Sequence, residues 1–265
     1  MTRLTRTPAE LKDVLIGAPG VSLVPTMGAL HSGHISLVRE AKKLGNPVVV
    51  SIFVNPLQFA PGEDLDAYPR TLDEDMAKLE AEGVDAVFAP SVSTMYPHGP
   101  RTTIHPGPLG SVLEGKTRPT HFAGVLTVVA KLFCLTGATD AFFGEKDYQQ
   151  LALIRQMVED LHLPVRVHGC PIVREDGGLA LSSRNRYLSP EEHEVALVLS
   201  RALATGSYEE ARSLIDATPD VDLDYLAVTT PDLSELPAGY RGPARLLVAA
   251  KVGTTRLIDN VAVEV

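Results

Sequence analysis

Residues 25–34, PTMGALHSGH, form the first segment of the chain whose side chains could do chemistry. The segment lies where a predicted buried strand ends and a helix begins, and in a parallel α/β sheet ligands bind at that place. A helix N-terminus offers unpaired N–H groups and a partial positive charge, so it suits phosphate. Gly28 and Gly33 let the backbone approach a ligand closely, and His31 and His34 are spaced to point at it together. Two histidines at this spacing could equally bind a metal, but no carboxylate or cysteine lies nearby in sequence, so the ligand set would need a distant residue.

Two amide side chains follow the next apolar run, residues 48–54. Asn55 and Gln58 are therefore expected at the carboxyl edge of the sheet. Because an amide both donates and accepts hydrogen bonds, the pair suits a small hydroxy acid. The alternative is that each residue only caps a turn.

A charged segment, residues 144–147, follows the predicted strand 141–143 and opens a helix that carries Gln150. Lys146 is then a cation at the same sheet edge as the histidines and can reach phosphate oxygens. Asp147 is placed to accept a hydrogen bond from a ribose hydroxyl. A lysine between two acids is otherwise an ordinary solvated charge.

Residues 182–185, Ser-Ser-Arg-Asn, follow a flexible Asp-Gly-Gly turn at 176–178. Hydroxyl groups beside a guanidinium suit phosphate. By itself this segment would be read as a polar loop or a helix cap. Its pairing with the histidine segment is what makes a phosphate-binding role the better interpretation.

The elements that position these residues alternate between strand and helix over the first two thirds of the chain. Apolar runs too continuous for surface strands alternate with segments that carry one apolar helical face. The pattern predicts an α/β fold, a doubly wound, Rossmann-like parallel sheet. The strands are expected at 21–24, 48–54, 86–89, 141–143 and 165–167, and the helices around 37–44, 72–79, 122–135 and 151–161.

The pattern changes after residue 173. Two helices near 191–203 and 208–215 precede strands near 225–229, 246–250 and 256–263. Helices followed by strands predict a second, smaller α+β domain at the C-terminal end. We place the domains at 1–172 and 173–265, and the chain contains no repeat and no low-complexity tract.

The composition restricts the partners. The chain has 265 residues, 45% hydrophobic residues and a formal net charge of −9, which fits a folded globular protein and argues against nucleic acid or an anionic membrane as partner. Several of its cations fall inside the segments discussed here and below: Arg70, Arg118, His121, Lys146, Arg184 and Arg186. The basic residues are thus expected where anions bind.

The two cysteines and the N-terminus indicate the compartment. Cys134 and Cys170 lie in apolar stretches whose spacing fits neither a metal site nor a disulfide framework, so buried free thiols are expected. Residues 1–8 lack the apolar core of a signal peptide, and no run approaches the ~18 apolar residues of a membrane span. A cytoplasmic protein is therefore expected.

The His-x-Gly-His pattern at 31–34 resembles the signature of the nucleotidyltransferase superfamily, and the serine-arginine segment resembles its second signature, a loop that closes over ATP phosphates. Further segments resemble the pantothenate synthetase family in that family's order, at 51–59, 63–71, 118–125, 143–150, 181–188 and 252–260. The resemblance covers nearly the whole chain.

The resemblance implies an ATP-dependent ligase that activates pantoate as an acyl-adenylate and transfers the pantoyl group to β-alanine. It implies a homodimer and a C-terminal domain that closes over ATP. The implied pantoate-binding residues are Gln58, Gln150, Asn55 and Met27. ATP would be bound by Met27, Gly28, His34, Gly144, Lys146, Asp147, Ser182 and Arg184. Catalysis would fall to His31, His34, Lys146, Ser182, Ser183 and Arg184, while Arg118 and His121 receive no definite role.

The chemistry sets further expectations. Positioning and charge stabilisation are enough for adenylate formation, so no covalent nucleophile is needed. Mg²⁺ is expected on ATP and water with at most one acidic side chain, such as Asp75. Residues 59–70 could close over the site and exclude water.

Two alternatives remain open at this point, and a third, a tRNA synthetase, is disfavoured. A nucleotidyltransferase that stops at a nucleotide product would have no use for the amide pocket. A nucleotide sensor without turnover would not need His31 or Lys146. A tRNA synthetase would need a tRNA-binding domain and a basic surface.

Overall fold

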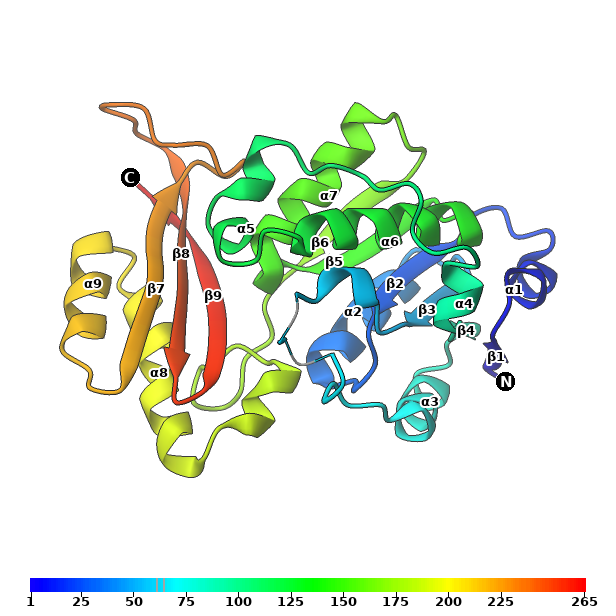
Figure 1. Ribbon diagram of the computed structural model, residues 1–265, viewed down its shortest axis with the longest axis horizontal. Helices are drawn as coiled ribbons and strands as arrows, with labels where there is room; N and C mark the ends of the chain where they lie inside the picture. Colours follow the sequence, from blue (N-terminus) through cyan, green and yellow to red (C-terminus); the bar gives the residue numbers. More distant parts are fainter. Residues whose placement is uncertain (61, 64) are drawn as a thin grey trace. The chain divides into compact units, whose positions relative to one another are not determined.

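A computed structural model describes residues 1–60, 62–63 and 65–265 of the chain (Figure 1). The chain divides into two compact units, residues 1–145 with 153–170, and residues 146–152 with 171–265. This division differs from the single boundary expected between residues 172 and 173. The second unit begins two residues earlier and also contains the short segment 146–152, which carries Lys146, Asp147 and Gln150.

The first unit is built on a six-stranded parallel sheet, which confirms the predicted fold class. Its strands lie in the order β1-β4-β3-β2-β5-β6. Continuous β-branched runs such as Val48–Val50 form central strands because both faces of such a sheet are covered. The strands are β1 (Arg3–Thr5), β2 (Ser22–Thr26), β3 (Val48–Ile52), β4 (Ala86–Phe88), β5 (Asp140–Gly144) and β6 (Arg166–Cys170).

Helices cover this sheet. The residues Leu37 and Val38 of α2 and Leu79 of α3 form one buried core with strand residues such as Val24 and Val50. β2 contacts both α2 and α6. The helices are α1 (Pro8–Leu15), α2 (Ser32–Lys42), α3 (Leu72–Ala81), α4 (Val92–Met95), α5 (Glu114–Thr117), α6 (His121–Thr136) and α7 (Tyr148–Asp160), with short 3₁₀ turns at Pro56–Gln58 and Pro108–Ser111.

The order of strands reverses between β2 and β5. From β2 the chain moves outward to β3 and β4, and it then returns to β5 on the other side of β2. Ligands of such sheets bind beyond the carboxyl ends of the strands at this reversal. The two strands end at Thr26 and Gly144, so the loop after β2 and Gly144 lie at the same sheet edge.

The second unit is a three-stranded antiparallel sheet with two helices, as the α+β prediction requires. α8 (Pro190–Ala204) and α9 (Tyr208–Asp216) share a core with β7 (Val221–Thr229), β8 (Pro243–Val252) and β9 (Thr255–Glu264). α8 begins at a capping box in which Ser189 and Glu192 each accept a backbone N–H of the other residue.

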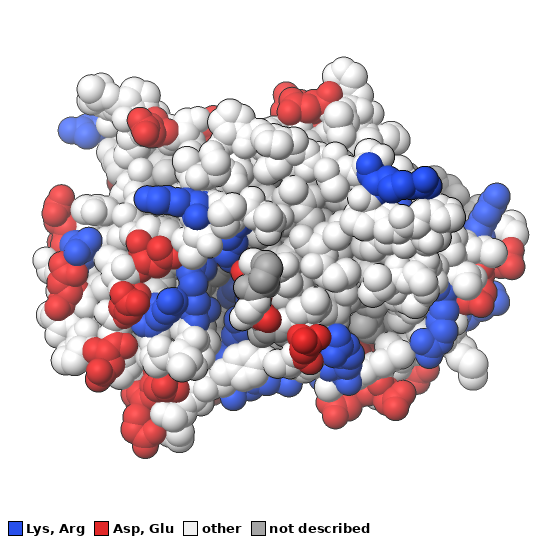
Figure 2. Space-filling view, viewed as in Figure 1, with Lys and Arg blue, Asp and Glu red and all other residues white. Residues whose placement is uncertain are grey.

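Acidic side chains dominate parts of the surface. On the face shown in Figure 2 they gather over α3 in the first unit and over α8 and α9 in the second. This distribution agrees with the net charge of −9 and disfavours polyanionic partners. No helix within the described ranges is long and apolar enough to cross a membrane.

The two cysteines differ in environment. Cys170 is buried at the end of β6, and burial raises the pKa of its thiol to about 11. Cys134 is exposed on α6, so its predicted burial is wrong. The residue lies one helical turn after the half-buried Lys131, on the side of α6 that faces solvent.

Candidate active site

The predicted site residues fall into two groups, one in each unit. The first unit holds Met27, Gly28, His31, His34, Asn55, Gln58 and Gly144. The second unit holds Lys146, Asp147, Gln150, Ser182, Ser183 and Arg184.

The loop after β2 has an unusual backbone that a buried carboxylate holds in place. Gly28 has a φ of +86°, and a Cβ there would come within 3.1 Å of both Asp75 and Ile52. Ala29 also has a positive φ, of +51°, which is uncommon for a residue with a side chain. The N–H groups of Ala29 and Leu30 donate to the two carboxylate oxygens of Asp75 at 2.9 and 2.8 Å. The Asp75 carboxylate therefore holds the backbone of residues 28–30 in this conformation.

This role replaces the expected role of Asp75 as a ligand of Mg²⁺. The carboxylate is fully buried, and Oδ2 also accepts a hydrogen bond from the Thr71 hydroxyl at 3.2 Å. Both carboxylate oxygens of Asp75 therefore accept hydrogen bonds from the protein itself. Among the residues that the structure describes, no cluster of three or more His, Cys, Asp or Glu side chains could hold a metal ion.

The two histidines cap α2 reciprocally. The N–H of Gly33 donates to Nδ1 of His31 at 3.2 Å, and the N–H of His31 donates to Nδ1 of His34 at 3.3 Å. Their ring centroids are 4.1 Å apart. Because each Nδ1 accepts a backbone proton, the neutral rings carry their own proton on Nε2. Both Nε2 atoms are then donors, which suits phosphate oxygens and disfavours the metal alternative.

A chain of hydrogen bonds fixes the orientation of the amide pair. Asn55 Oδ1 accepts from the buried Tyr96 hydroxyl at 2.9 Å, and its Nδ2 donates to the Gly124 carbonyl and to Gln58 Oε1, both at 3.1 Å. The remaining polar group of Gln58 is then its amino group, which donates to Met27 Sδ at 3.1 Å. Burial raises the pKa of Tyr96 to about 12, so the hydroxyl remains a donor. A ligand atom placed against this amino group would therefore have to be an acceptor.

Arg118 and His121, whose roles the sequence leaves open, support the backbone of Gln58. His121 Nδ1 donates to the Gln58 carbonyl at 2.9 Å, and Arg118 donates to the same carbonyl at 3.3 Å. Arg118 also forms two hydrogen bonds to Glu63, at 2.8 and 2.7 Å. Burial acts to raise the pKa of Glu63, but hydrogen bonding and attraction to Arg118 outweigh it and lower that pKa.

The segment expected to close over the site, residues 59–70, is described in part, because Pro61 and Asp64 lie outside the described residues. Phe59 and Tyr68 meet edge to face at 6.0 Å. The Arg70 guanidinium donates to the carbonyls of Leu65 and Asp66 within its own loop, and the side chain is exposed.

The second group begins directly after β5. Lys146 and Asp147 lie in a 3₁₀ turn, Glu145–Asp147, and form a long ion pair of 3.8 Å. The Lys146 side chain is 20% exposed and that of Asp147 is 51% exposed, so both can meet a ligand. Gln150 is half-buried in the first turn of α7, whereas its neighbour Gln149 is buried.

The serine-arginine segment forms a 3₁₀ turn, Ser183–Tyr187, capped by Ser182, whose hydroxyl accepts from the N–H of Arg184 at 3.3 Å. Asn185 ties this turn to the preceding hairpin, since its Nδ2 donates to Glu175 Oε1 at 2.7 Å and to the Ala180 carbonyl at 3.1 Å. The three site residues Ser182, Ser183 and Arg184 are thereby held on a short, anchored turn.

Sequence reasoning did not identify the supporting roles of several residues, and it offered Asp75 only as a possible ligand of Mg²⁺. Asp75 reads as part of an acidic helix start, and Tyr96 lies in no recognisable motif. Gly124 and the pair Asp259 and Asn260 lie in segments that carry the family resemblance, but spacing alone gave them no role. Their partners are distant in sequence, so only the fold reveals them.

Comparison with known proteins places the chain among ligases. A family model described as pantoate-beta-alanine ligase matches residues 3–262. The chain is 65% identical over 254 residues to a protein named pantothenate synthetase from Corynebacterium jeikeium, covering 92% of this chain and 82% of the relative. It is 62% identical over 270 residues to a pantothenate synthetase from Nocardia farcinica, covering 97% and 84% of the two chains.

Solved structures agree along the whole chain. A pantothenate synthetase from Thermus thermophilus superimposes with a TM-score of 0.93 and 49% identity over 98% of this chain and 99% of the other. A pantoate-beta-alanine ligase from Francisella tularensis, complexed with β-γ ATP and β-alanine, gives a TM-score of 0.84 and 35% identity over 98% and 97%.

Proposed function

The chain belongs to the pantoate-β-alanine ligase family, and from this membership we propose that it condenses pantoate with β-alanine using ATP. The products are pantothenate, AMP and pyrophosphate, and a pantoyl-adenylate is the intermediate. The observation that carries the proposal is the reciprocally capped pair His31 and His34, both donors through Nε2, at the reversal point of the parallel sheet.

In the first step the pantoate carboxylate attacks the α-phosphorus of ATP and pyrophosphate leaves. Gln58, Gln150 and Met27 hold pantoate, and the amino group of Gln58 donates to one of its oxygens. Asn55, which is buried and paired at both amide atoms, contributes by orienting Gln58. His31, His34, Lys146, Ser182, Ser183 and Arg184 stabilise the charge that grows on the phosphates. Gly28, Gly144 and Asp147 complete the ATP site. This division of labour is positioning and electrostatic stabilisation.

In the second step the β-alanine amine attacks the adenylate carbonyl. The new C–N bond forms, the C–O bond to AMP breaks, and the amine loses a proton to the departing phosphate or to water. The adenylate reacts readily with water, so the site must exclude it. Residues 59–70, anchored through Glu63 and Arg118, are proposed to close over the first unit's part of the site.

Mg²⁺ is proposed to enter with ATP. The ion prefers oxygen ligands and usually retains water and substrate phosphates. Asp75 does not fit as its ligand because its oxygens already accept hydrogen bonds from the loop 28–30 and from Thr71. We therefore propose that Mg²⁺ would bind the ATP phosphates and would supply positive charge near the leaving pyrophosphate.

The family resemblance also leads us to propose a homodimer, a second unit that closes over the ATP phosphates, and a cytoplasmic location. Two free cysteines with no disulfide between them suit a reducing compartment. Sedimentation at micromolar concentration should give twice 28.4 kDa, and a single species of 28.4 kDa would contradict the dimer.

The stoichiometry of the complete reaction tests the proposal. With pantoate, β-alanine and Mg-ATP, the enzyme should form pantothenate, AMP and pyrophosphate in equal amounts. ADP as product would contradict adenylate chemistry. A nucleotide-containing final product would favour the nucleotidyltransferase alternative, and no turnover with retained ATP binding would favour the sensor.

A further inference from the structure

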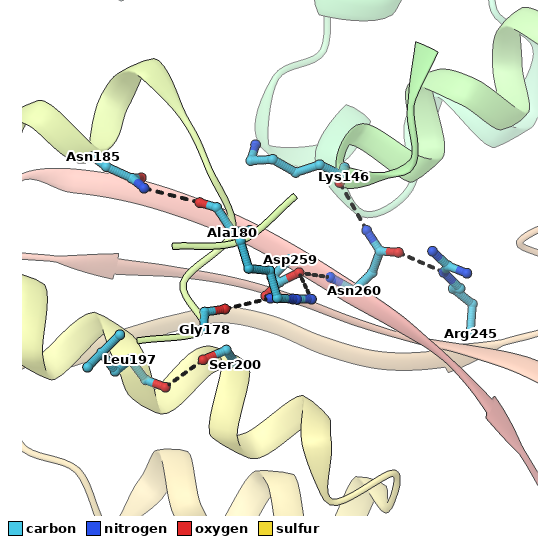
Figure 3. A network of polar contacts seen from close by, with 10 residues as sticks. Lys146, Gly178, Ala180, Asn185, Leu197, Ser200, Arg245, Asp259 and Asn260 are labelled. Carbon is cyan, nitrogen blue, oxygen red and sulfur yellow. Dashed lines mark hydrogen bonds and ion pairs between the residues drawn. The ribbon is translucent and has the colours of Figure 1, made fainter. Parts of the chain in front are cut away.

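Asn260, a buried amide on β9, holds the backbone of Lys146. Its Nδ2 donates to the Lys146 carbonyl at 2.9 Å, and its Oδ1 accepts from Arg245 Nε at 2.7 Å (Figure 3). The orientation of the amide is fixed because Arg245 can only donate and a carbonyl can only accept. Arg245 also contacts the segment 146–152 directly, because its guanidinium lies over the Tyr148 ring, 4.0 Å from the ring centre, as in a cation–π interaction.

Asp259, the preceding residue of β9, holds a different segment. Its carboxylate pairs with both terminal nitrogens of Arg174 at 2.6 and 2.9 Å, and Arg174 also donates to the Gly178 carbonyl at 2.9 Å. Arg174 and Ala180 pair across a hairpin, and the Ala180 carbonyl receives the Asn185 amide. Asp259 thus anchors the hairpin that leads into residues 182–184.

One short hydrogen bond joins the two anchors. The N–H of Asn260 donates to Asp259 Oδ1 at 2.7 Å, and both residues are almost fully buried, at 2% and 3% exposure. A continuous set of contacts therefore runs from the Lys146 backbone through β9 to the hairpin and to Asn185, while the Lys146 side chain extends away from it (Figure 3). The side chains of Asp259 and Asn260 are buried and hydrogen-bonded at both of their polar atoms, and breaking such buried contacts costs free energy.

We propose that Asp259 and Asn260 are positioning residues for catalysis, which hold Lys146 and the serine-arginine turn in a fixed relation within the second unit. The inference rests on the proposed function, in which both segments contact the ATP phosphates. In this proposal the two residues act through the segments that contact the substrates and not by contacting a substrate themselves. Preorganised donors give catalysis only when they are held in place before the charge develops.

The test uses Asn260→Asp, which nearly preserves the shape of the side chain. The new carboxylate keeps the acceptor for Arg245 and gains an ion pair, but it places an oxygen against the Lys146 carbonyl. We expect the melting temperature to stay within a few degrees of wild type, while pyrophosphate exchange at saturating ATP and pantoate falls about tenfold, the typical effect of one lost buried hydrogen bond. A protein with unchanged melting temperature and unchanged exchange would overturn the inference.

A double-mutant cycle with Lys146→Ala separates positioning from general damage. If Asn260 acts through the Lys146 side chain, Asn260→Asp should add little to the loss caused by Lys146→Ala. Multiplicative losses would contradict action through Lys146. If Lys146→Ala alone exchanges normally, the proposed role of Lys146 fails; if only Asn260→Asp is normal, the positioning inference fails alone.

If Asn260→Asp folds poorly, Asp259→Asn provides a second test of the positioning proposal. It removes the charge that pairs with Arg174 and should also reduce exchange about tenfold. The matched control is Asp224→Asn on β7. It breaks an ion pair of 2.6 Å with Arg256, which lies on β9 like Asp259 but outside this network. Equal losses from Asp259→Asn and Asp224→Asn would show that any broken ion pair in the sheet has this effect, and would overturn the inference.

Discussion

At the scale of single residues, the candidate site depends on orientation as much as on residue type. An amide or an imidazole can donate or accept at either end, and its neighbours decide which. Backbone N–H groups fix the protons of His31 and His34 on Nε2, and the Tyr96 hydroxyl with the Gly124 carbonyl fixes Asn55. The site thus presents donors, which is what phosphate and carboxylate oxygens require.

Replacing Lys146 with Ala should lower kcat by roughly 10²-fold or more, because one preorganised charged donor typically contributes ~3 kcal/mol to the stability of a transition state. The fold should be intact, since the side chain is partly exposed. Steady-state kinetics and circular dichroism check this. Lys251→Ala, an exposed lysine on β8, should leave kcat unchanged; a near-normal kcat for Lys146→Ala would remove that residue from the mechanism.

Replacing Tyr96 with Phe should raise the KM for pantoate by about two- to tenfold while the KM for ATP stays the same. The change deletes one hydrogen bond of 2.9 Å to Asn55, and such a bond contributes about 0.5 to 1.5 kcal/mol. Tyr208→Phe, on the surface helix α9, is the control. Equal shifts in both KM values would show that Tyr96 supports the fold in general and not the orientation of the amides.

The sequence locates the residues that we propose to contact a ligand better than those that support them. His31, Gln58 and Lys146 each follow a recognisable strand, so their place at the sheet edge can be deduced. Asp75 and Tyr96 act on residues more than 40 positions away, and no local pattern encodes such a pairing. Their roles depend on tertiary contacts alone.

At the scale of elements, close approach between α6 and the turn Pro56–Gln58 shapes the amide pair. A Cβ at position 124 would lie 2.3 Å from the Leu57 carbonyl oxygen, which is too close for a non-bonded carbon and oxygen. Gly124 is therefore required by the packing of these two elements and not by its own backbone conformation.

Gly124→Ala should displace the turn, raise the KM for pantoate at least tenfold and lower the free energy of unfolding by about 1 to 3 kcal/mol, as overpacking does. Urea unfolding and steady-state kinetics measure the two effects. Gly144→Ala offers a contrast in the same unit, since a Cβ there would meet nothing within 4 Å, and its stability should change little. A normal free energy of unfolding and a normal KM for pantoate in Gly124→Ala would show that the turn Pro56–Gln58 can move to accommodate the Cβ, and would contradict this requirement for glycine.

The elements themselves were largely predictable, with understandable exceptions. Strands such as β3 and β4 are continuous apolar runs, and α6 and α8 carry clear helical periodicity, so each was found to within a few residues. The short edge strand β1 and the helices α1, α4 and α5 have no counterpart in the sequence prediction. β1 is three residues long and its first two residues are exposed, which leaves almost no hydrophobic signal.

At the scale of the whole molecule, the stability should depend on pH through Asp140 at the start of β5. This buried carboxylate accepts hydrogen bonds from Arg166 at 2.8 and 3.0 Å and contacts His168 at 2.8 Å. The hydrogen bonds from Arg166, which outweigh the opposing effect of burial, lower the pKa of Asp140 to about 2 from 3.8. An acid with a lowered pKa stabilises the fold above its unfolded pKa, and that contribution disappears as pH falls through the folded pKa.

Asp140→Asn should therefore lower the free energy of unfolding by about 1 to 2 kcal/mol at pH 6, since water weakens the pair with the largely exposed Arg166. The difference from wild type should shrink between pH 4 and pH 2. Urea unfolding across this range measures it, with the exposed Asp13→Asn as control. A difference that does not change with pH would assign the loss to packing and not to charge.

The division of the chain was predictable only in part. The change from alternating strands and helices to an α+β pattern predicts a boundary near residue 172, and the second unit resumes at 171. Nothing in the sequence indicates that residues 146–152 join that unit. Their attachment depends on the side chains of Arg245 and Asn260, about 100 residues later in the chain.

Pyrophosphate exchange shows directly whether a pantoyl-adenylate forms before the amine reacts. With pantoate and Mg-ATP but no β-alanine, the enzyme should transfer labelled pyrophosphate into ATP, because the first step is reversible. Omission of pantoate should abolish the exchange, since no other acceptor is held within reach of the α-phosphorus. Exchange without pantoate, or no exchange from an enzyme that still forms pantothenate and AMP, would contradict the stepwise mechanism.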